Sequence, residues 1–166
     1  MTDEDRAILI KLPEHAILAL TAFLEARNQP VQGIVAVMYS VINRMKIGTR
    51  GKTIAEVCYW PWQYSCWNTG DPNLTRGSRI AMKLIDGESL EIESDLIVFQ
   101  TCIFLADRIL DRLNIVREQV LDPSFGATHY YNPQAVEKSP DWADPKTGSK
   151  KTKQIGQHMF FKSVAM

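Results

Sequence analysis

Residues 17–30 read Ile-Leu-Ala-Leu-Thr-Ala-Phe-Leu-Glu-Ala-Arg-Asn-Gln-Pro, and this stretch is the most informative guide to the fold. Its apolar residues form one broad face of a helix that runs up to Glu25, with Pro13 at an early position of that helix. Pro30 follows at once and suits the first turn of a second helix. The stretch therefore predicts two consecutive helices with a carboxylate close to their junction.

Glu25 stands at the end of this apolar helical run. A carboxyl group held beside apolar turns has its ionised form disfavoured, and the protonated form is the one that acts as a general acid. Thr21 and Leu18 lie one and two turns before Glu25 on the same side of the helix. A carboxyl group in such a place suggests the cleavage of a glycosidic bond.

Hydrophobic periodicity predicts that most of the chain is helical. After the first helix, the expected helices span residues 30–46, 75–86 and 94–113, with Gly48 and Gly87 as stops. Residues 94–113 are apolar on most sides, so we expect them to form the buried central helix. Thr53 and Glu56 have the spacing of a capping box, which gives Glu56 a structural role.

Two short stretches near the C-terminus favour extended structure. Residues 128–131 and 159–162 are aromatic and β-prone, and we expect a small sheet or a pair of extended segments that lines the site. The basic residues between them are predicted to lie on a solvated loop, with contact to carboxylates or to an anionic surface as the alternative. They are Lys146, Lys150, Lys151 and Lys153.

Several short motifs follow one another along the chain. They are Glu25-Ala26-Arg27, Gly33, Ala36-Val37, Val41-Ile42-Asn43-Arg44, Val57-Cys58, Gln63-Tyr64-Ser65, Gly126-Ala127-Thr128-His129-Tyr130-Tyr131-Asn132-Pro133, Trp142 and Ile155-Gly156-Gln157-His158-Met159-Phe160. In this order, from about Leu18 to Phe161, they resemble the cell wall hydrolase family named after the spore cortex-lytic enzymes. The block from Gly126 to Pro133 is long and chemically unusual, which makes the resemblance specific.

The resemblance implies a mainly α (α+β) fold, a lysozyme-like single catalytic domain with a small β element lining the groove. It implies an enzyme that cleaves peptidoglycan glycan strands at the β-1,4 bond between N-acetylmuramic acid and N-acetylglucosamine. The family's members resemble lytic transglycosylases, and the Glu of the Glu-Ala-Arg motif is their catalytic acid, which corresponds to Glu25. This sequence departs from the family pattern at Asn28, where Gly is common, and at Trp62, where a small residue often precedes the Gln.

The aromatic, irregular segment 59–73 is a candidate sugar-binding region. Sugars stack their C–H faces on aromatic rings, and their hydroxyls bond to Gln, Ser and Asn side chains. Trp62 and Trp67 flank Gln63 and Ser65, so we expect at least one ring to face the groove, whereas the alternative is a small core under a loop. The full set of candidate substrate contacts is Gln63, Ser65, Trp62, Trp67, Thr128, Tyr130, Tyr131 and Asn132.

Alternation along an extended segment gives Thr128 and Tyr130 one face and His129 and Tyr131 the other. We expect the Thr128 and Tyr130 face to meet the groove, because a small hydroxyl beside a phenol suits the N-acetyl and hydroxyl groups of a muramic residue. Tyr131 and His129 would then bond within the protein.

The number of catalytic carboxylates separates two mechanisms. A hydrolysing muramidase usually pairs its acid with a second carboxylate, whereas a lytic transglycosylase can use one Glu and leave a 1,6-anhydro end. Asp71 is the best second candidate, although a Gly-Asp-Pro turn explains it equally well. We therefore favour the transglycosylase.

A metal site is the main alternative chemistry. His129 and His158 could contribute to a zinc site, and the function would then be a zinc-dependent amidase or peptidase acting on peptide stems. The chain has no His-x-x-x-His or Cys-x-x-Cys spacing, so we expect no metal and no cofactor. A catalytically silent glycan-binding domain is a third possibility.

Composition bounds the remaining properties. The chain has 166 residues with 19 basic and 19 acidic side chains, so we expect one domain over residues 1–166, a monomer, and no nucleic-acid partner. Cys58, Cys66 and Cys102 are expected as small buried thiols, with a Cys58–Cys66 pair as the alternative. The acidic N-terminus lacks the features of a secretory signal, and no apolar run is long enough to span a bilayer. We expect a protein made in the cytoplasm without stable membrane insertion, such as a phage endolysin in its host, that acts on the wall.

Overall fold

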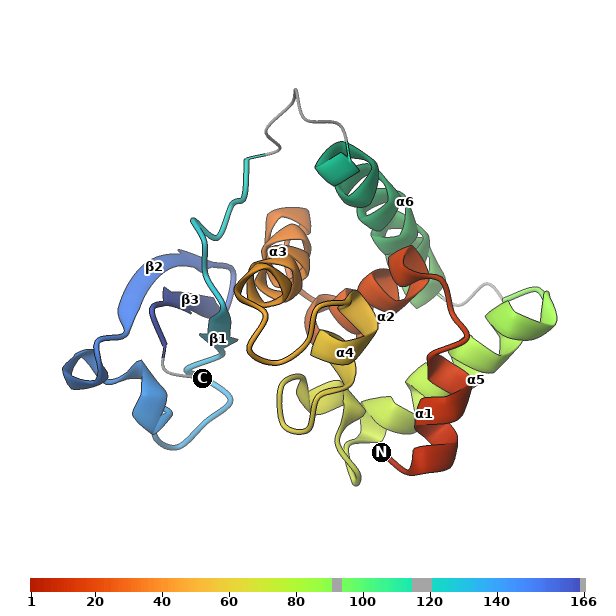
Figure 1. Ribbon diagram of the computed structural model, residues 1–166, viewed down its shortest axis with the longest axis horizontal. Coiled ribbons are helices and arrows are strands. Elements are labelled where there is room, and N and C mark those ends of the chain that lie inside the picture. The colour runs from red at the N-terminus through yellow and green to blue at the C-terminus, as the bar shows by residue number, and fades with distance from the viewer. Residues whose placement is uncertain (91–93, 115–120, 165–166) are drawn as a thin grey trace.

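Helix α2, Glu14–Ala26, is the centre of the fold. The computed structural model describes residues 1–90, 94–114 and 121–164. Within α2 every residue from Ala16 to Leu24 is buried, and the helix contacts α3 (Val31–Ile47), α4 (Ile54–Tyr59), α5 (Pro72–Asp86) and α6 (Ser94–Asn114). Figure 1 shows α2 in the middle of the helical part of the molecule. The apolar run that leads to Glu25 is therefore buried on all sides rather than on one broad face.

Helices α3 to α6 surround α2, and helix α1 (Asp3–Leu9) contacts α5. Short 3₁₀ turns lie at Ser65–Trp67, Asp141–Ala143 and Pro145–Thr147. The expectation that residues 94–113 form the buried central helix is wrong. Phe99 and Cys102 of α6 are buried, but Ile97 and Phe104 are 64% and 59% exposed, so α6 covers the core from outside.

The predicted helix boundaries rest on capping chemistry. Gly48 ends α3 in the left-handed conformation, with φ of 77°, and Pro30 precedes its first turn. Thr53 and Glu56 form the predicted capping box of α4. Helix α5 begins at Pro72, earlier than predicted, because the Asp71 side chain accepts a hydrogen bond from the Asn73 backbone N–H and caps the helix.

Three strands form a small antiparallel sheet in the order β1-β3-β2. They are β1 (His129–Tyr131), β2 (Lys150–Ile155) and β3 (His158–Lys162). Tyr130 pairs with Phe160 across β1 and β3, which confirms the two predicted extended segments. The basic stretch is not a loop as expected, because Lys150, Lys151 and Lys153 pair with β3 as the edge strand β2.

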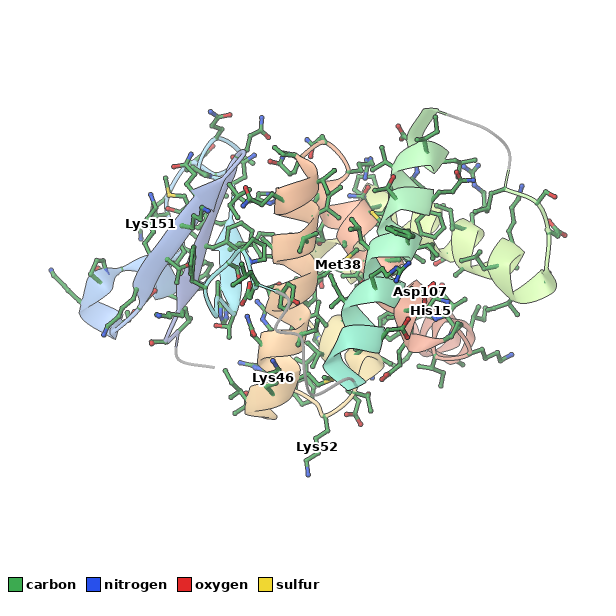
Figure 2. The ribbon with its side chains drawn as sticks, turned by 90° about the horizontal axis from the view of Figure 1, so that it is seen from above. His15, Met38, Lys46, Lys52, Asp107 and Lys151 are labelled. Atoms are coloured by element: carbon green, nitrogen blue, oxygen red, sulfur yellow. The ribbon has the colours of Figure 1, made fainter. Side chains whose placement is uncertain are left out.

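The sheet packs beside helix α3. Figure 2 shows α3 between the sheet and α6, with Lys151 on the outer side of the sheet. The turn after β2 reaches the loop between α2 and α3, where the Gln29 side-chain oxygen accepts a hydrogen bond of 2.9 Å from the Gln157 backbone N–H. Gly156 has φ of 56°, and a Cβ there would lie 2.9 Å from Pro30 Cδ and 2.4 Å from the Gln29 oxygen, so this turn favours glycine. These contacts bring the sheet to the end of α2 that carries Glu25.

The three cysteines are isolated thiols inside the fold. Cys58, Cys66 and Cys102 are free and buried, as expected for small thiols, and burial raises the pKa of Cys58 and of Cys102 to about 12. Within the described residues no helix has the length and apolar character needed to cross a membrane. The observed architecture is mainly α with a small sheet, as predicted.

Candidate active site

Glu25 lies in the last turn of α2, and its half-buried carboxylate accepts three hydrogen bonds. The Ser65 hydroxyl and the Cys66 backbone N–H donate to Oε1 at 3.0 Å and 2.8 Å. The Tyr130 hydroxyl donates to Oε2 at 2.8 Å. Three segments far apart in sequence thus converge on one carboxylate and hold it in a single orientation.

A polar cleft of about 360 Å³ opens over Glu25. It lies between the helical part and the sheet, and its walls come from α2, the end of α3, the segment after α4, β1 and the turn that follows. The residues that line it are Glu25, Arg44, Arg50, Trp62, Gln63, Ser65, Asn68, His129, Tyr130 and Trp142. Glu25 is the one carboxylate among these lining residues of the described chain.

Tyr130 is held over Glu25 by ring packing. Its ring lies 4.9 Å from the His158 ring and 5.5 Å from the Phe160 ring, between centroids. Burial and the adjacent Glu25 carboxylate raise the pKa of Tyr130 well above its ordinary value. The phenol therefore keeps its proton and acts toward Glu25 as a hydrogen-bond donor.

Asn43 and Arg44 of α3 position the segment that carries Tyr130. The Asn43 amide donates to the Ala127 carbonyl at 2.9 Å, and the Arg44 guanidinium donates to the Thr128 carbonyl. Arg44 also donates to the Gln63 carbonyl at 3.1 Å and lies over the Tyr64 ring. The side chains of these two adjacent residues thus hold the backbone of both walls of the cleft.

Four of the predicted site residues line the cleft with Glu25. Gln63, Ser65 and Tyr130 lie there as expected, and Trp62 lies at its edge with 82% of its surface exposed. Trp62 has φ of 65°, a left-handed conformation that is uncommon for a bulky residue, and its N–H donates to the Asn68 side chain. The backbone is therefore strained where it presents this ring.

Trp67 is not part of the cleft, and its expected sugar contact is wrong for this conformation. Its side chain is 3% exposed, its Nε1 donates to the Thr21 hydroxyl at 3.0 Å, and its ring packs edge-on against Tyr59. The ring also lies close to the Cα of Gly77, where a Cβ would clash with it. Trp67 closes the core under the loop, which was the stated alternative.

Thr128 and Tyr130 were both expected to face the groove; this prediction is right for Tyr130 and wrong for Thr128. Thr128 is buried, and its hydroxyl lies 3.0 Å from the His129 ring nitrogen. His129 also lines the cleft although it alternates with Tyr130 along the strand, so the cleft is lined from both faces of β1. Tyr131 lies on the other side of the strand, where its hydroxyl bonds to Ser139 at 3.1 Å and its ring contacts Trp142.

Asn132 and Asn28 both lie outside the cleft. The Asn132 side chain donates to the Gln157 side chain at 3.3 Å and accepts from the Gln134 backbone N–H, so it organises the turn after β1. Asn28 replaces the family's usual Gly without a positive φ, and its side chain accepts a bond from Gln29. The departure at Asn28 therefore leaves the loop after Glu25 intact.

The described residues offer neither a metal site nor a second carboxylate in the cleft. In residues 1–90, 94–114 and 121–164 no group of three or more His, Cys, Asp or Glu side chains is arranged to hold a metal ion. Burial, with the nearby Arg44 and Arg50 charges, lowers the pKa of His129 to about 3. Asp71 caps α5 and does not line the cleft. His129 is thus a neutral ring at neutral pH, and Asp71 has a structural role.

Sequence reasoning missed five of the lining residues as site candidates: Arg44, Arg50, Asn68, His129 and Trp142. Arg44 and Trp142 lay within the motifs but carried no pattern that distinguishes a groove residue from a core residue. Arg50 and Asn68 lie in loops, where periodicity gives no direction for a side chain.

Comparisons with known proteins agree with this geometry. A family model described as Cell Wall Hydrolase matches residues 28–161, beginning just after Glu25. A spore cortex-lytic enzyme of Halalkalibacterium halodurans is 27% identical over 145 residues, which cover 87% of this chain and 33% of that protein. The chain thus spans about a third of the length of that relative.

Two solved structures share the fold, including the lysozyme-like arrangement expected from sequence. The catalytic domain of the Bacillus cereus SleB protein has a TM-score of 0.54 and 21% identity, with 90% of this chain and 89% of that chain covered. The catalytic domain of the germination-specific lytic transglycosylase SleB from Bacillus anthracis has a TM-score of 0.50 and 20% identity, covering 91% and 97%.

Proposed function

This chain belongs to the cell wall hydrolase family, and from that premise we propose that it cleaves peptidoglycan glycan strands as a lytic transglycosylase. The bond is the β-1,4 link between N-acetylmuramic acid and N-acetylglucosamine. The observation that carries the proposal is Glu25, the one carboxylate among the described lining residues, held by Ser65 and Tyr130 at the floor of a polar cleft.

In the first step the protonated Glu25 carboxyl donates its proton to the glycosidic oxygen. The bond from that oxygen to C1 of the muramic residue breaks, and positive charge develops at C1. In the second step the Glu25 carboxylate takes the proton of the muramic 6-hydroxyl, whose oxygen attacks C1. The products are a 1,6-anhydro end and a new hydroxyl end, no water is consumed, and Glu25 is protonated again.

The partners of Glu25 suit this double role. Tyr130 can donate to a carboxylate or accept from a carboxyl, because a phenol does both. Ser65 and the Cys66 backbone N–H hold Oε1, which leaves Oε2 as the oxygen that exchanges the proton. Gln63, Asn68 and the exposed Trp62 ring offer amide groups and a stacking surface for the sugars.

The single-carboxylate mechanism is favoured over a hydrolysing muramidase. A muramidase needs a second carboxylate within about 5–10 Å of the acid, to act as nucleophile or to activate water. Asp71, the predicted second candidate, accepts from the Asn73 N–H as a helix cap. The name of the solved Bacillus anthracis domain, a lytic transglycosylase, points the same way.

Mass spectrometry of digested, purified peptidoglycan tests the proposal. We expect soluble fragments with 1,6-anhydro-muramic ends. Reducing muramic ends would indicate a muramidase, and freed peptide stems with activity lost to a chelator and restored by zinc would indicate the metal-dependent amidase or peptidase. Binding without any release of fragments would indicate a glycan-binding domain.

We also propose a biological role for the enzyme: it is a phage endolysin that is made in the host cytoplasm and acts on the wall. Production inside Gram-negative cells tests this, with and without a separate protein that permeabilises the inner membrane. Lysis that depends on permeabilisation fits the proposal, and the absence of lysis after permeabilisation contradicts it.

A further inference from the structure

Arg50 brings a positive charge to the cleft without a carboxylate partner. The residue is half-buried and lines the same cleft as Glu25, His129 and Trp142. Its guanidinium carbon lies 5.9 Å from the centroid of the Trp60 ring. None of the ion pairs found among the described residues involves Arg50.

The loop that carries Arg50 is fixed in place. It begins at Gly48, which ends α3 in the left-handed conformation, and it includes Gly51, with φ of 136°. The Glu56 carboxylate then accepts hydrogen bonds from the Lys52 and Thr53 backbone N–H groups. Because the backbone is held on both sides of Arg50, its side chain can be presented to a ligand at a small entropic cost.

The other arginine of the cleft has a different role. The Arg44 guanidinium is buried and donates to the carbonyls of Thr128 and Gln63, so its donors serve the protein. Arg50 has no such acceptor among the described residues, and its charge is felt inside the cleft, where it helps to lower the pKa of His129. An unpaired guanidinium in a polar cleft is suited to a carboxylate, which it binds with two parallel hydrogen bonds.

We propose that Arg50 binds a carboxylate of the substrate, so that the enzyme prefers glycan strands whose muramic residues carry an anionic lactyl arm. This inference rests on the proposed function. N-acetylglucosamine is neutral, whereas the lactyl arm of muramic acid ends in a free carboxylate or in a peptide stem that bears carboxylates. Arg50 would therefore distinguish the muramic side of the bond and orient the strand over Glu25.

Three soluble substrates made from the same glycan strands test the proposal. The first carries peptide stems, the second has been stripped by an amidase to free lactyl carboxylates, and in the third those carboxylates are converted to neutral methylamides. We expect the wild-type kcat/KM to be about tenfold higher on at least one anionic substrate, the scale of a charge-assisted hydrogen bond. If only the first substrate is cleaved faster, Arg50 binds a carboxylate of the peptide stem. If the second substrate is also cleaved faster, Arg50 binds the lactyl carboxylate.

Arg50→Gln should remove the preference by slowing cleavage of the anionic strands about tenfold and leaving the neutral strand within about twofold. Arg50→Lys keeps the charge and should retain part of the preference, and added salt should narrow it in the wild type. Lys52→Gln is the matched control. It removes one charge from the same loop, and Figure 2 shows the Lys52 side chain extending away from the molecule into solvent.

Equal slowing on all three substrates, or no slowing on any, would overturn the inference. An equal wild-type rate on the three substrates would also overturn it while leaving the proposed function standing. If the wild type cleaves none of the three, the proposed function itself fails.

Discussion

Tyr130 and Tyr131 are adjacent in β1, yet their hydroxyls have different partners. The Tyr130 hydroxyl donates to Glu25, whereas the Tyr131 hydroxyl bonds to Ser139 at the surface. Tyr130→Phe should lower kcat at least tenfold, because a hydrogen bond to a charged group contributes about 1.5–3 kcal/mol. Tyr131→Phe should change kcat little and stability by less than about 1 kcal/mol. Rates and melting temperatures of both variants check this, and exchanged results would place Tyr131 at the groove.

Trp62 and Trp67 separate a surface ring from a core ring. Trp62→Gly removes the exposed ring and relieves left-handed backbone strain, which should stabilise the folded state by about 1–2 kcal/mol. The greater freedom of glycine in the unfolded chain should offset about 0.5–1 kcal/mol of that gain. Stability should therefore change little while glycan binding weakens. Trp67→Ala should cost about 3–5 kcal/mol of stability. Denaturant titration beside glycan-binding measurements checks both; unchanged stability with lost binding in the Trp67 variant would return that ring to the site.

The sequence predicted some of these residues for a physical reason. Glu25 ends an apolar helical run and Tyr130 alternates with its neighbours, and both also lie in motifs that resemble the cell wall hydrolase family. Trp62 and Trp67 could not be separated, because both lie in an irregular segment and the backbone strain at Trp62 leaves no mark on composition. Thr128 was placed wrongly because alternation separates the two faces of a strand but does not tell which residues a cleft reaches: His129 and Tyr130 lie on opposite faces and both line it, while Thr128 is buried.

At the scale of elements, α3 is the part that joins the helices to the sheet. The Asn43 amide donates to the Ala127 carbonyl and to the Asp122 carboxylate, both at 2.9 Å. Asn43→Ala should cost about 1–3 kcal/mol, because the buried Ala127 carbonyl loses its donor, whereas the Asp122 carboxylate still accepts from the Gly126 backbone N–H. The variant should also lower kcat by a larger factor than it raises KM, because Tyr130 loses its fixed position.

Amide hydrogen exchange checks where that cost falls. Exchange in β1 should become faster in Asn43→Ala while exchange in α2 stays close to the wild type. Uniformly faster exchange throughout the chain would mean that Asn43 stabilises the whole fold and has no special relation to the cleft.

Helix caps were the most predictable elements. Gly48 and the Thr53–Glu56 box end and begin helices as expected, because these are local chemical signals. Strand β2 was missed because a strand at the edge of a sheet faces solvent and can be rich in lysine. The burial of α2 rather than α6 follows from tertiary packing, which periodicity within one helix does not determine.

For the whole molecule, the half-buried His129 and the buried His158 make stability depend on pH. Burial lowers the pKa of His129 to about 3, and burial also lowers the pKa of His158, from an ordinary value of 6.5. Between these values the unfolded chain binds more protons than the folded protein, so stability is full above pH 6.5 and falls as the pH drops. His129→Gln should flatten this dependence between pH 6.5 and about pH 4.

Denaturant unfolding of the wild type and of His129→Gln across that pH range measures how the free energy of unfolding of each protein changes with pH. Carboxylates contribute equally to both proteins and cancel in the comparison. Identical slopes would mean that His129 becomes protonated in the folded state and lies in a wetter cleft than the structure shows.

The most direct test of the central claim is the rate of wall clearing by Glu25→Gln at matched concentrations of folded protein. The amide keeps the shape of the side chain but cannot donate and then take back a proton at the scissile oxygen. General acid–base catalysis contributes about 100- to 10,000-fold, so we predict a loss of at least about 100-fold with wall binding retained. A variant that keeps more than about a tenth of the wild-type rate would contradict the assignment of Glu25 as the catalytic acid.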